Sequence, residues 1–513
     1  MIVRTSGKLP FLLTLLFHAG LLLGQPGTLD PTFGTDGITI TAAVGSDDQV
    51  ADLAVQQDDR IVVVGNTVTG GNYDIMVLRY TADGFPDETF GTNGRVQLSF
   101  GTGNDVAYAV ALQTDGKIVV GGSTAVGSVS RALLVRLLSD GSLDPDFGTN
   151  GRVISAIGSS SHSSSVRDLV IQPDGKLLAG GRATNNSTNR TFFMVARYNP
   201  SGTNDVSFDQ EGYALVDVGQ DNINDLGTCI GLLDDGRIML GGSTLIDSNY
   251  RFALVRMLAD GTQDYMNFNL NGSYIADLGP SDDQAESMVL LPDGTTVLVG
   301  KGDSQFTLLG VNELGYQSTT FGTAITPIGI TSNANDAVLQ PWDKTIAVGR
   351  SLGNDGDALT LARYDAQGDL DPSFGTNGIV TTAVPPYSNA ALYGVGLQSD
   401  GSIVVAGRVG NSSQASNVLV ARYSNDFTTG TTALPAFNGT LNAYPNPFED
   451  RITANGTSAG GQLMLSDAAG RVIMRTLTTD GSTTMPTPQL PAGAYILTYH
   501  SGERWHRVGV VHP

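Results

Sequence analysis

The stretch that decides the fold lies between Asp105 and Ala156, where DVAYAVALQTDG, KIVVGGS, RALLVRLLSDGSLDPDFG and NGRVISA follow one another. Each piece contains a short apolar run bounded by Asp-Gly or Gly-Gly, a pattern typical of strands between tight turns. The runs are apolar at consecutive positions, which indicates a sheet that is buried on both faces. The unit therefore predicts a four-stranded sheet stacked between similar sheets, like the blade of a β-propeller.

The same unit recurs along the chain, and a Phe ahead of a turn residue marks each copy. The markers are Phe33, Phe90, Phe147, Phe208, Phe268, Phe321 and Phe374, at spacings of 57, 57, 61, 60, 53 and 53 residues. Periods of this length are typical of arrays, solenoids and propellers. We therefore expect seven repeats.

The order of strands at the two ends predicts how the ring closes. Gly37 to Ala42 resembles the fourth strand of a unit, NGRVISA, yet it comes before the first strand of any unit. The last unit stops after its third strand, NVLVARYSNDF. The N-terminal strand can complete the last blade, which leaves no open sheet edge. We therefore predict an all-β chain, with a seven-bladed propeller closed by an N-terminal strand and a small C-terminal β-sandwich.

A second pattern supports this closure. An Arg in the third strand is followed eight residues later by an Asp in the pairs Arg79/Asp87, Arg136/Asp144, Arg197/Asp205, Arg256/Asp264 and Arg363/Asp371. The fifth unit has lost both residues, to Gly310 and Ser318, as expected for two side chains that pair. Arg422 lacks such an Asp, and Asp30 lacks an Arg. We expect these two residues to form an ion pair that closes the ring.

The repeats resemble the delta-60 family of bacterial exported proteins. The motifs that carry this resemblance are QTDGKIVVGG, QPDGKLLAGG and ARYDAQGDLDPSFGTNG, and the similar region covers about residues 28 to 427. The resemblance implies a propeller-like fold and assigns no biochemical activity. We expect the propeller to occupy residues 25–427.

The first 24 residues are typical of a secretory signal peptide. Arg4 and Lys8 precede an apolar run from Leu9 to Leu23, which is too short for a membrane span. We expect no transmembrane segment after its removal. Cys229 is the only cysteine, so no intrachain disulfide can form, and its apolar strand predicts a core position.

The C-terminal region has a different composition. Residues 428–440 are rich in Thr, Gly, Ala and Pro and predict a linker, whereas short strands separated by turns predict a β-sandwich over 441–513. This domain resembles the type A sorting domain of the type IX secretion system. The resemblance is carried by Tyr444, Pro445, Asn446 and Pro447, by Gly470 in DAAGRVI, and by Gly493 and Tyr495 in LPAGAYIL. It implies passage through the type IX machinery of a Gram-negative bacterium, to the medium or the outer-membrane surface.

Charge limits the partners of the propeller. The whole chain has a formal net charge of -22, and residues 25–439 hold 45 acidic and 21 basic side chains. Such a field repels phosphate backbones, so nucleic acid is not expected as a partner. Cations and neutral polymers fit the charge better, although acidity also serves solubility.

The sequence offers little material for catalysis, and we assign no catalytic residue. His162 is the only histidine between the signal peptide and the tail, so a histidine zinc site or a Ser-His-Asp triad is not expected. Asp140, Asp144 and Asp146 have spacings that a calcium loop could use, but the terminal Glu is missing and near copies recur as turns. We expect no cofactor, with calcium left open.

Function is sought where the repeats differ. A mostly polar row of residues is expected near the entrance of each innermost strand. Its members lie five residues before Gln57, Gln113, Gln172, Leu233, Leu291, Gln340 and Gln398. This row is Asp52, Tyr108, Arg167, Thr228, Glu286, Asn335 and Tyr393. Mixed charge, amide and phenol groups suit a saccharide or peptide pocket, although a solvated strand end would look the same.

Three functions remain open at this point. The leading hypothesis is a non-enzymatic surface or secreted binding module for glycans or envelope components. The alternatives are a carboxylate-dependent, glycan-directed hydrolase with its site at the propeller mouth, and a structural or adhesive protein without a small-molecule site. Convergence of Asp52, Tyr108, Arg167 and Glu286 on one cavity would favour a pocket.

Overall fold

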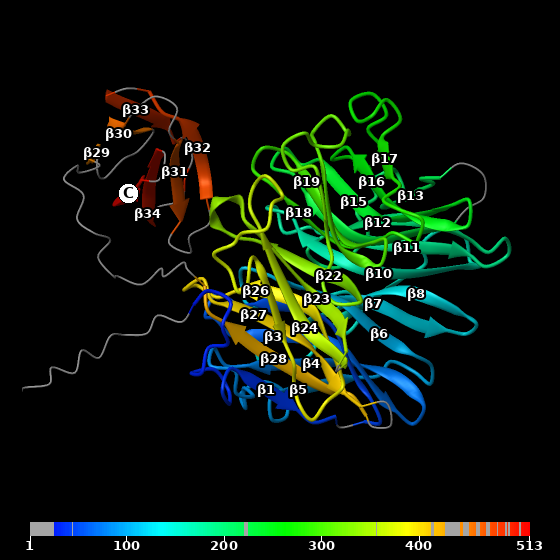
Figure 1. Cartoon of the computed structure of the whole chain (residues 1–513). Helices are drawn as coiled ribbons and strands as arrows, with labels where there is room; N and C mark the ends of the chain where they lie inside the picture. The colour runs from blue at the N-terminus through cyan, green and yellow to red at the C-terminus, as the bar shows by residue number, and fades with distance from the viewer. Residues whose placement is uncertain are drawn as a thin grey trace, which may run out of the picture.

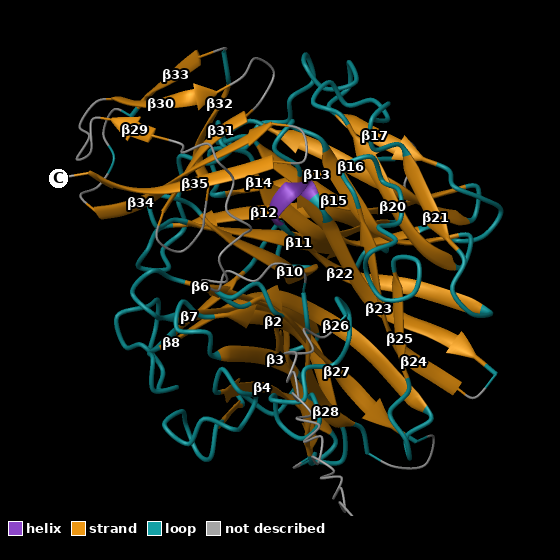
Figure 2. Ribbon diagram, turned by 60° about the vertical axis from the view of Figure 1, so that its left-hand side comes forward, coloured by secondary structure: helices purple, strands orange, loops and turns teal. Residues whose placement is uncertain are grey.

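The computed structural model describes residues 25–425, apart from 44, 220–223, 355 and 412–414, and parts of the region from 442 to 512. The expected signal peptide (1–24) and linker (428–440) lie outside the described residues. Figure 2 shows strands throughout, with one 3₁₀ turn, η1 (Pro341–Asp343). Within these ranges, no helix is both long and apolar enough to cross a membrane.

Seven four-stranded antiparallel sheets form the propeller, which confirms the predicted fold. From the inside outward, each blade has strands A, B, C and D. The A strands are β2 (Asp48–Val55), β6 (Asp105–Leu112), β10 (His162–Ile171), β14 (Asp225–Leu232), β18 (Gln284–Leu290), β22 (Thr331–Leu339) and β26 (Asn389–Leu397). The B strands are β3 (Ile61–Thr69), β7 (Ile118–Val126), β11 (Leu177–Asn185), β15 (Ile238–Ile246), β19 (Thr296–Gly302), β23 (Thr345–Gly353) and β27 (Ile403–Gly410).

The outer strands follow in the same order, from blade 1 to blade 7. The C strands are β4 (Asn72–Tyr80), β8 (Val129–Leu137), β12 (Arg190–Tyr198), β16 (Asn249–Met257), β20 (Gln305–Val311), β24 (Gly356–Tyr364) and β28 (Asn417–Tyr423). The D strands are β5 (Arg95–Leu98), β9 (Arg152–Ser155), β13 (Tyr213–Val216), β17 (Ser273–Ala276), β21 (Thr323–Thr326), β25 (Ile379–Thr382) and, for blade 7, β1 (Ile38–Thr41).

The N-terminal strand closes the ring as predicted. Strand β1 pairs antiparallel with β28, with Ile38 opposite Ala421 and Thr41 opposite Val418. In Figure 1 the blue β1 lies beside the orange β28, so the two ends of the propeller sequence meet in one sheet. Phe33 belongs to the apolar core shared by blades 7 and 1, which fixes the closing strand by burial as well as by hydrogen bonds.

The repeated Arg, Asp and Phe form one structural unit, which we call the latch. In blade 2, Arg136 Nε lies 2.7 Å from Asp144 Oδ2, and the guanidinium carbon lies 4.4 Å from the centroid of the Phe147 ring. Arg136 Nη1 donates to Pro200 O in blade 3, so the latch also joins neighbouring blades. Each such Arg is buried, and its charge is satisfied by Asp, by a carbonyl and by an aromatic face.

The latch recurs around the ring. Its equivalent contacts to the next blade are Arg79 to Ser139 O, Arg197 to Ala259 O, Arg256 to Glu313 O, Arg363 to Asn425 Oδ1 and Arg422 to Ala82 O. Arg422 Nη2 lies 2.8 Å from Asp30 Oδ2, so this latch joins residues that are 392 positions apart in the chain.

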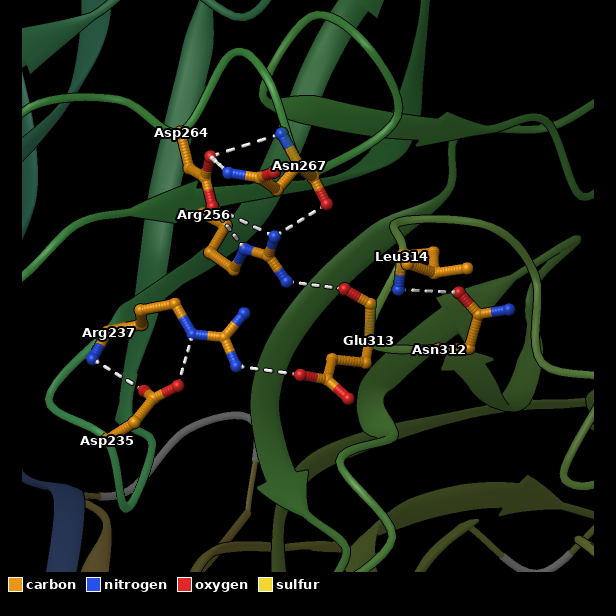
Figure 3. Close-up of polar contacts among 8 residues, drawn as sticks. All are labelled: Asp235, Arg237, Arg256, Asp264, Asn267, Asn312, Glu313 and Leu314. Carbon is orange, nitrogen blue, oxygen red and sulfur yellow. Dashed lines mark hydrogen bonds and ion pairs between the residues drawn. The ribbon is translucent and has the colours of Figure 1, made fainter.

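Figure 3 shows the latch of blade 4. Arg256 Nη2 donates to Asn267 O at 2.6 Å, its Nε donates to Asp264 Oδ2 at 3.0 Å, and its Nη1 reaches the carbonyl of Glu313. The Glu313 side chain accepts from Arg237 at 2.8 Å, which adds a second link between blades 4 and 5. Arg237 and Arg256 are therefore both engaged in holding blades 4 and 5 together.

Blade 5 has no latch arginine, because Gly310 occupies its place. A Cβ on Gly310 would lie 2.7 Å from Phe321 Cβ, closer than real Cβ contacts. We expect Gly310→Ala to lower the free energy of unfolding by about 1–3 kcal/mol, the usual range for overpacking a core. Chemical denaturation of the variant measures this. Gly101→Ala, at a position with nothing within 4 Å, is the control and should leave stability unchanged.

The C-terminal region contains two sheets, as expected for a sandwich. One holds β29 (Asn442–Tyr444), β30 (Arg451–Thr457) and β33 (Gly481–Pro486), and the other holds β31 (Gln462–Asp467), β32 (Val472–Leu477), β34 (Gly493–Ser501) and β35 (Arg504–His512). They share a core that includes Ile452, Leu465 and Tyr495. Of the motif residues, Pro445, Asn446, Pro447 and Gly470 lie outside the described residues, whereas Tyr444 ends β29 and Gly493 begins β34.

Candidate binding site at the propeller mouth

Every innermost strand contains a β-bulge at the same place. In blade 6, for example, the pairing of β22 with β23 shifts between Ala334 and Asp336, so Asn335 is the extra residue. Bulges re-aim side chains and are common beside functional sites. The bulged residues are Ala51, Tyr108, Arg167, Thr228, Glu286, Asn335 and Tyr393.

Asp52 does not belong to this row, which corrects the sequence-based alignment. Val55 pairs with Ile61 as Leu112 pairs with Ile118, so Gln56, not Gln57, corresponds to Gln113. The bulged residue of blade 1 is therefore Ala51. The one-residue error arose because Asp59 occupies the left-handed turn position, with φ of 64°, where the other units mostly have glycine.

Three residues of the predicted row line one cavity. Glu286, Asn335 and Tyr393, from blades 5, 6 and 7, border a cavity of about 560 Å³. It opens at the mouth, which we define as the end of the ring axis where the A strands begin and the B strands end. Amide groups of Gln284, Asn333 and Asn389 complete a polar lining.

Tyr108 and Arg167 lie outside that lining and contact each other. The Arg167 guanidinium carbon is 3.7 Å from the centroid of the Tyr108 ring, which joins blades 2 and 3 by a cation–π contact. Burial lowers the pKa of Arg167 to about 10, while the charge of Glu286 opposes this shift. Burial likewise raises the pKa of Glu286, although Arg167 and Lys301 act against it. The two side chains therefore interact electrostatically between blades 3 and 5.

Two members of the row also join blades. Asn335 Nδ2 donates to Leu392 O at 2.6 Å, and Thr228 Oγ1 donates to Ala285 O at 2.8 Å. These bonds satisfy inner-strand carbonyls and fix the side chains. Glu286 and Tyr393 remain the row's principal groups for contacting a ligand in the cavity.

A second row, one residue after the bulge, was missed from the sequence. Its aspartates are Asp52, Asp168 and Asp336, in blades 1, 3 and 6. Each accepts a backbone N–H from the next blade, at 2.8, 2.8 and 2.9 Å respectively. Burial raises the pKa of Asp168 and of Asp336 to about 6, and burial together with the charge of Asp336 raises that of Asp52.

These aspartates predict an unusual pH dependence of stability. An Asp in the unfolded chain has a pKa near 3.8, so between about pH 4 and 6 the folded protein binds more protons and its stability falls as pH rises. We expect the thermal midpoint to be about 3 °C higher at pH 5 than at pH 7.5. Differential scanning calorimetry measures this shift. The double variant Asp168→Asn, Asp336→Asn should flatten the profile, and an unchanged profile would contradict the assignment.

The remaining chemical candidates lie in structural settings. The polar stretch GSSSHSSSV around His162 predicts a solvated loop, but His162 is buried at the start of β10, where its Nδ1 contacts Ser159 Oγ at 2.7 Å. Cys229 is buried. Asp144 binds Arg136, and Asp140 accepts two bonds from Ser142. Among the residues that the structure describes, no cluster of three or more His, Cys, Asp or Glu is placed to hold a metal ion.

The fold and the mouth define a repeat-built propeller that is closed by its own N-terminal strand. Comparison with family models gives its family. Six segments match the beta-propeller domain of unknown function DUF5122, at residues 56–90, 113–147, 172–208, 233–265, 343–374 and 398–426. Residues 442–509 match the secretion system C-terminal sorting domain. The propeller repeats thus match this family, and the sorting domain indicates that the chain is exported by the type IX secretion system to the cell surface or beyond.

A search of solved structures gives matches of low identity and low TM-score. PorZ of Porphyromonas gingivalis, described as an essential surface component of the type IX secretion system, is 11% identical with a TM-score of 0.39, and the match covers 93% of this chain and 61% of PorZ. Sqt1 of Chaetomium thermophilum is 12% identical with a TM-score of 0.41, and 77% of this chain and 88% of Sqt1 are covered. The chain thus spans about three fifths of PorZ. No curated protein matches it.

Proposed function

We propose that this exported propeller is a non-enzymatic binding module and that its ligand occupies the mouth. The observation that carries the proposal is the cavity of about 560 Å³ bordered by Glu286, Asn335 and Tyr393. A volume in this range suits a small oligosaccharide or peptide, and polar groups placed in a cavity fix the orientation of a ligand and give specificity. Glycans and other envelope components are the ligands that a surface protein meets.

The carboxylates near the mouth favour binding over hydrolysis. A glycosidase needs two carboxyl groups that are free to donate and accept protons on either side of the scissile bond. Asp52, Asp168 and Asp336 instead accept backbone N–H groups of the neighbouring blade. Their oxygens are thus occupied in holding the inner strands together. Of the two carboxyl groups that line the cavity, Asp357 pairs with Arg350, which leaves Glu286 without a second free carboxyl group in the described lining.

A thermal-shift screen of the full-length secreted chain tests the proposal. The panel contains neutral and acidic oligosaccharides and short peptides. A ligand that binds only the folded chain raises the thermal midpoint, and at 100 times its Kd it adds about 2.7 kcal/mol of stability. We expect at least one panel member to raise the midpoint, and the shift to be lost in Tyr393→Ala.

Tyr316→Ala is the matched control, because this exposed tyrosine lies in the C-to-D turn of blade 5, away from the mouth. Its midpoint shift should equal that of the wild type. A panel without any shift would favour the structural or adhesive function. A shift that survives Tyr393→Ala would place the ligand elsewhere on the chain.

A further inference from the structure

The B strands carry a second set of side chains at the mouth. Each of these residues pairs with the A-strand position two residues before the bulge, as Arg182 pairs with Ser165 and Lys301 with Gln284. Around the ring the set is Asn66, Ser123, Arg182, Ser243, Lys301, Arg350 and Arg408. Four of these seven side chains are cationic, in blades 3, 5, 6 and 7.

These cations contrast with the charge of the propeller around them. Residues 25–439 hold only 21 basic side chains against 45 acidic ones, yet this ring places four basic and no acidic residues at equivalent positions. The latches lie at the end of the ring axis opposite the mouth, which we call the latch face, and cations there such as Arg79, Arg136 and Arg237 are engaged with Asp, Glu and carbonyl groups. Among the described residues, no ion pair or hydrogen bond engages the side chains of Arg182 and Lys301, although both charges act on Glu286.

Lys301, Arg350 and Arg408 line the cavity that Glu286 and Tyr393 also border. Arg350 lies 3.3 Å from Asp357 and donates to Asn333 Oδ1, but its own side chain is about half exposed, so solvent screens part of its charge pairing. Arg408 lies 5.6 Å from the centroid of the Tyr393 ring, which places a guanidinium beside the aromatic surface. The cavity therefore presents three cations against the two carboxylates of Glu286 and Asp357, together with amides and one phenol.

We infer that the mouth binds a carboxylate-bearing saccharide, an inference that rests on the proposed function and names its ligand class. Arginine forms paired hydrogen bonds to a carboxylate, and lysine adds a point charge. The amides of Gln284 and Asn389 lie in the same lining and suit sugar hydroxyl groups. The acidic outer surface does not prevent binding, because salt at physiological strength screens exposed charges beyond about 8 Å.

Isothermal titration calorimetry on the full-length secreted chain tests this inference, with tetragalacturonate as the acidic probe and maltotetraose as the neutral one. We expect tetragalacturonate to bind, maltotetraose to bind at least 10-fold more weakly, and the acidic probe to lose affinity as NaCl increases. Lys301→Gln and Arg408→Gln should each weaken binding of tetragalacturonate about 10-fold, the loss of one charge-assisted contact.

Arg251→Gln is the matched control, because Arg251 pairs with Asp277 in the outer part of blade 4. It should bind tetragalacturonate like the wild type. Equal affinity for maltotetraose would overturn the acidic ligand class and leave the binding function standing. Lack of tetragalacturonate binding, or binding that survives both Lys301→Gln and Arg408→Gln, would also overturn the inference. The binding function itself fails only if the thermal-shift panel gives no shift that depends on Tyr393.

Discussion

Arg422→Met is expected to lower the free energy of unfolding by about 3–5 kcal/mol, the cost of removing one partner from a buried ion pair. Arg422 is buried, and besides Asp30 it contacts Ala82 O, Gln398 Oε1 and Thr32 Oγ1. Methionine keeps most of the apolar volume, so the change removes chiefly the guanidinium. Urea denaturation followed by circular dichroism measures the difference.

Arg79→Met separates ring closure from the general effect of a latch. Arg79 makes the same kind of contacts, but it joins blades 1 and 2, which are consecutive in the chain. Only Arg422→Met should speed amide hydrogen exchange in β1, because that strand is held by the end of the propeller sequence. If Arg422→Met keeps the slow amide exchange of β1 and the unfolding midpoint of the wild type, Arg422 does not secure the closure.

Removal of residues 442–513 is expected to abolish export while leaving the propeller folded. The matched segment, residues 442–509, is the sorting domain, whereas the propeller core is built from strands that end at Tyr423. The truncated chain should therefore accumulate in the periplasm with a native far-ultraviolet spectrum. Cell fractionation and immunoblotting measure its location.

The matched control is a fusion of residues 428–513 to a fluorescent protein that carries a signal peptide. This fusion should leave the cell, since the sorting domain acts on whatever cargo precedes it. A truncated propeller that still reaches the medium, or a fusion that stays in the periplasm, would contradict the role of the tail.

Much of the fold is predictable from the sequence, because the same pattern of strands and turns recurs in every unit. Three features can be read directly from the sequence: the Phe spacing, the early D strand, and the joint loss of Arg and Asp at Gly310 and Ser318. Other features cannot be read in this way. The second half of most latches is a bond from Arg to a backbone carbonyl of the next blade, and any residue type can supply that carbonyl.

The site was only partly predictable, for reasons that lie in the inner strands. Glu286, Asn335 and Tyr393 were found because they interrupt apolar strands. Asp52 was misplaced because Asp59 stands where most other units have a glycine, and the alignment of blade 1 was therefore shifted by one residue. The cations such as Lys301 were missed because the search followed only the A strands, whereas strand pairing brings B-strand residues to the same mouth.

A crystal structure of the secreted chain grown with tetragalacturonate would show directly whether the mouth is the binding site. We expect a sugar in the cavity between blades 5, 6 and 7, with a carboxylate within about 3 Å of Arg408 or Lys301 and a ring near Tyr393. Sugar bound on the outer blades or on the latch face, with the mouth holding only water, would contradict a ligand site at the mouth.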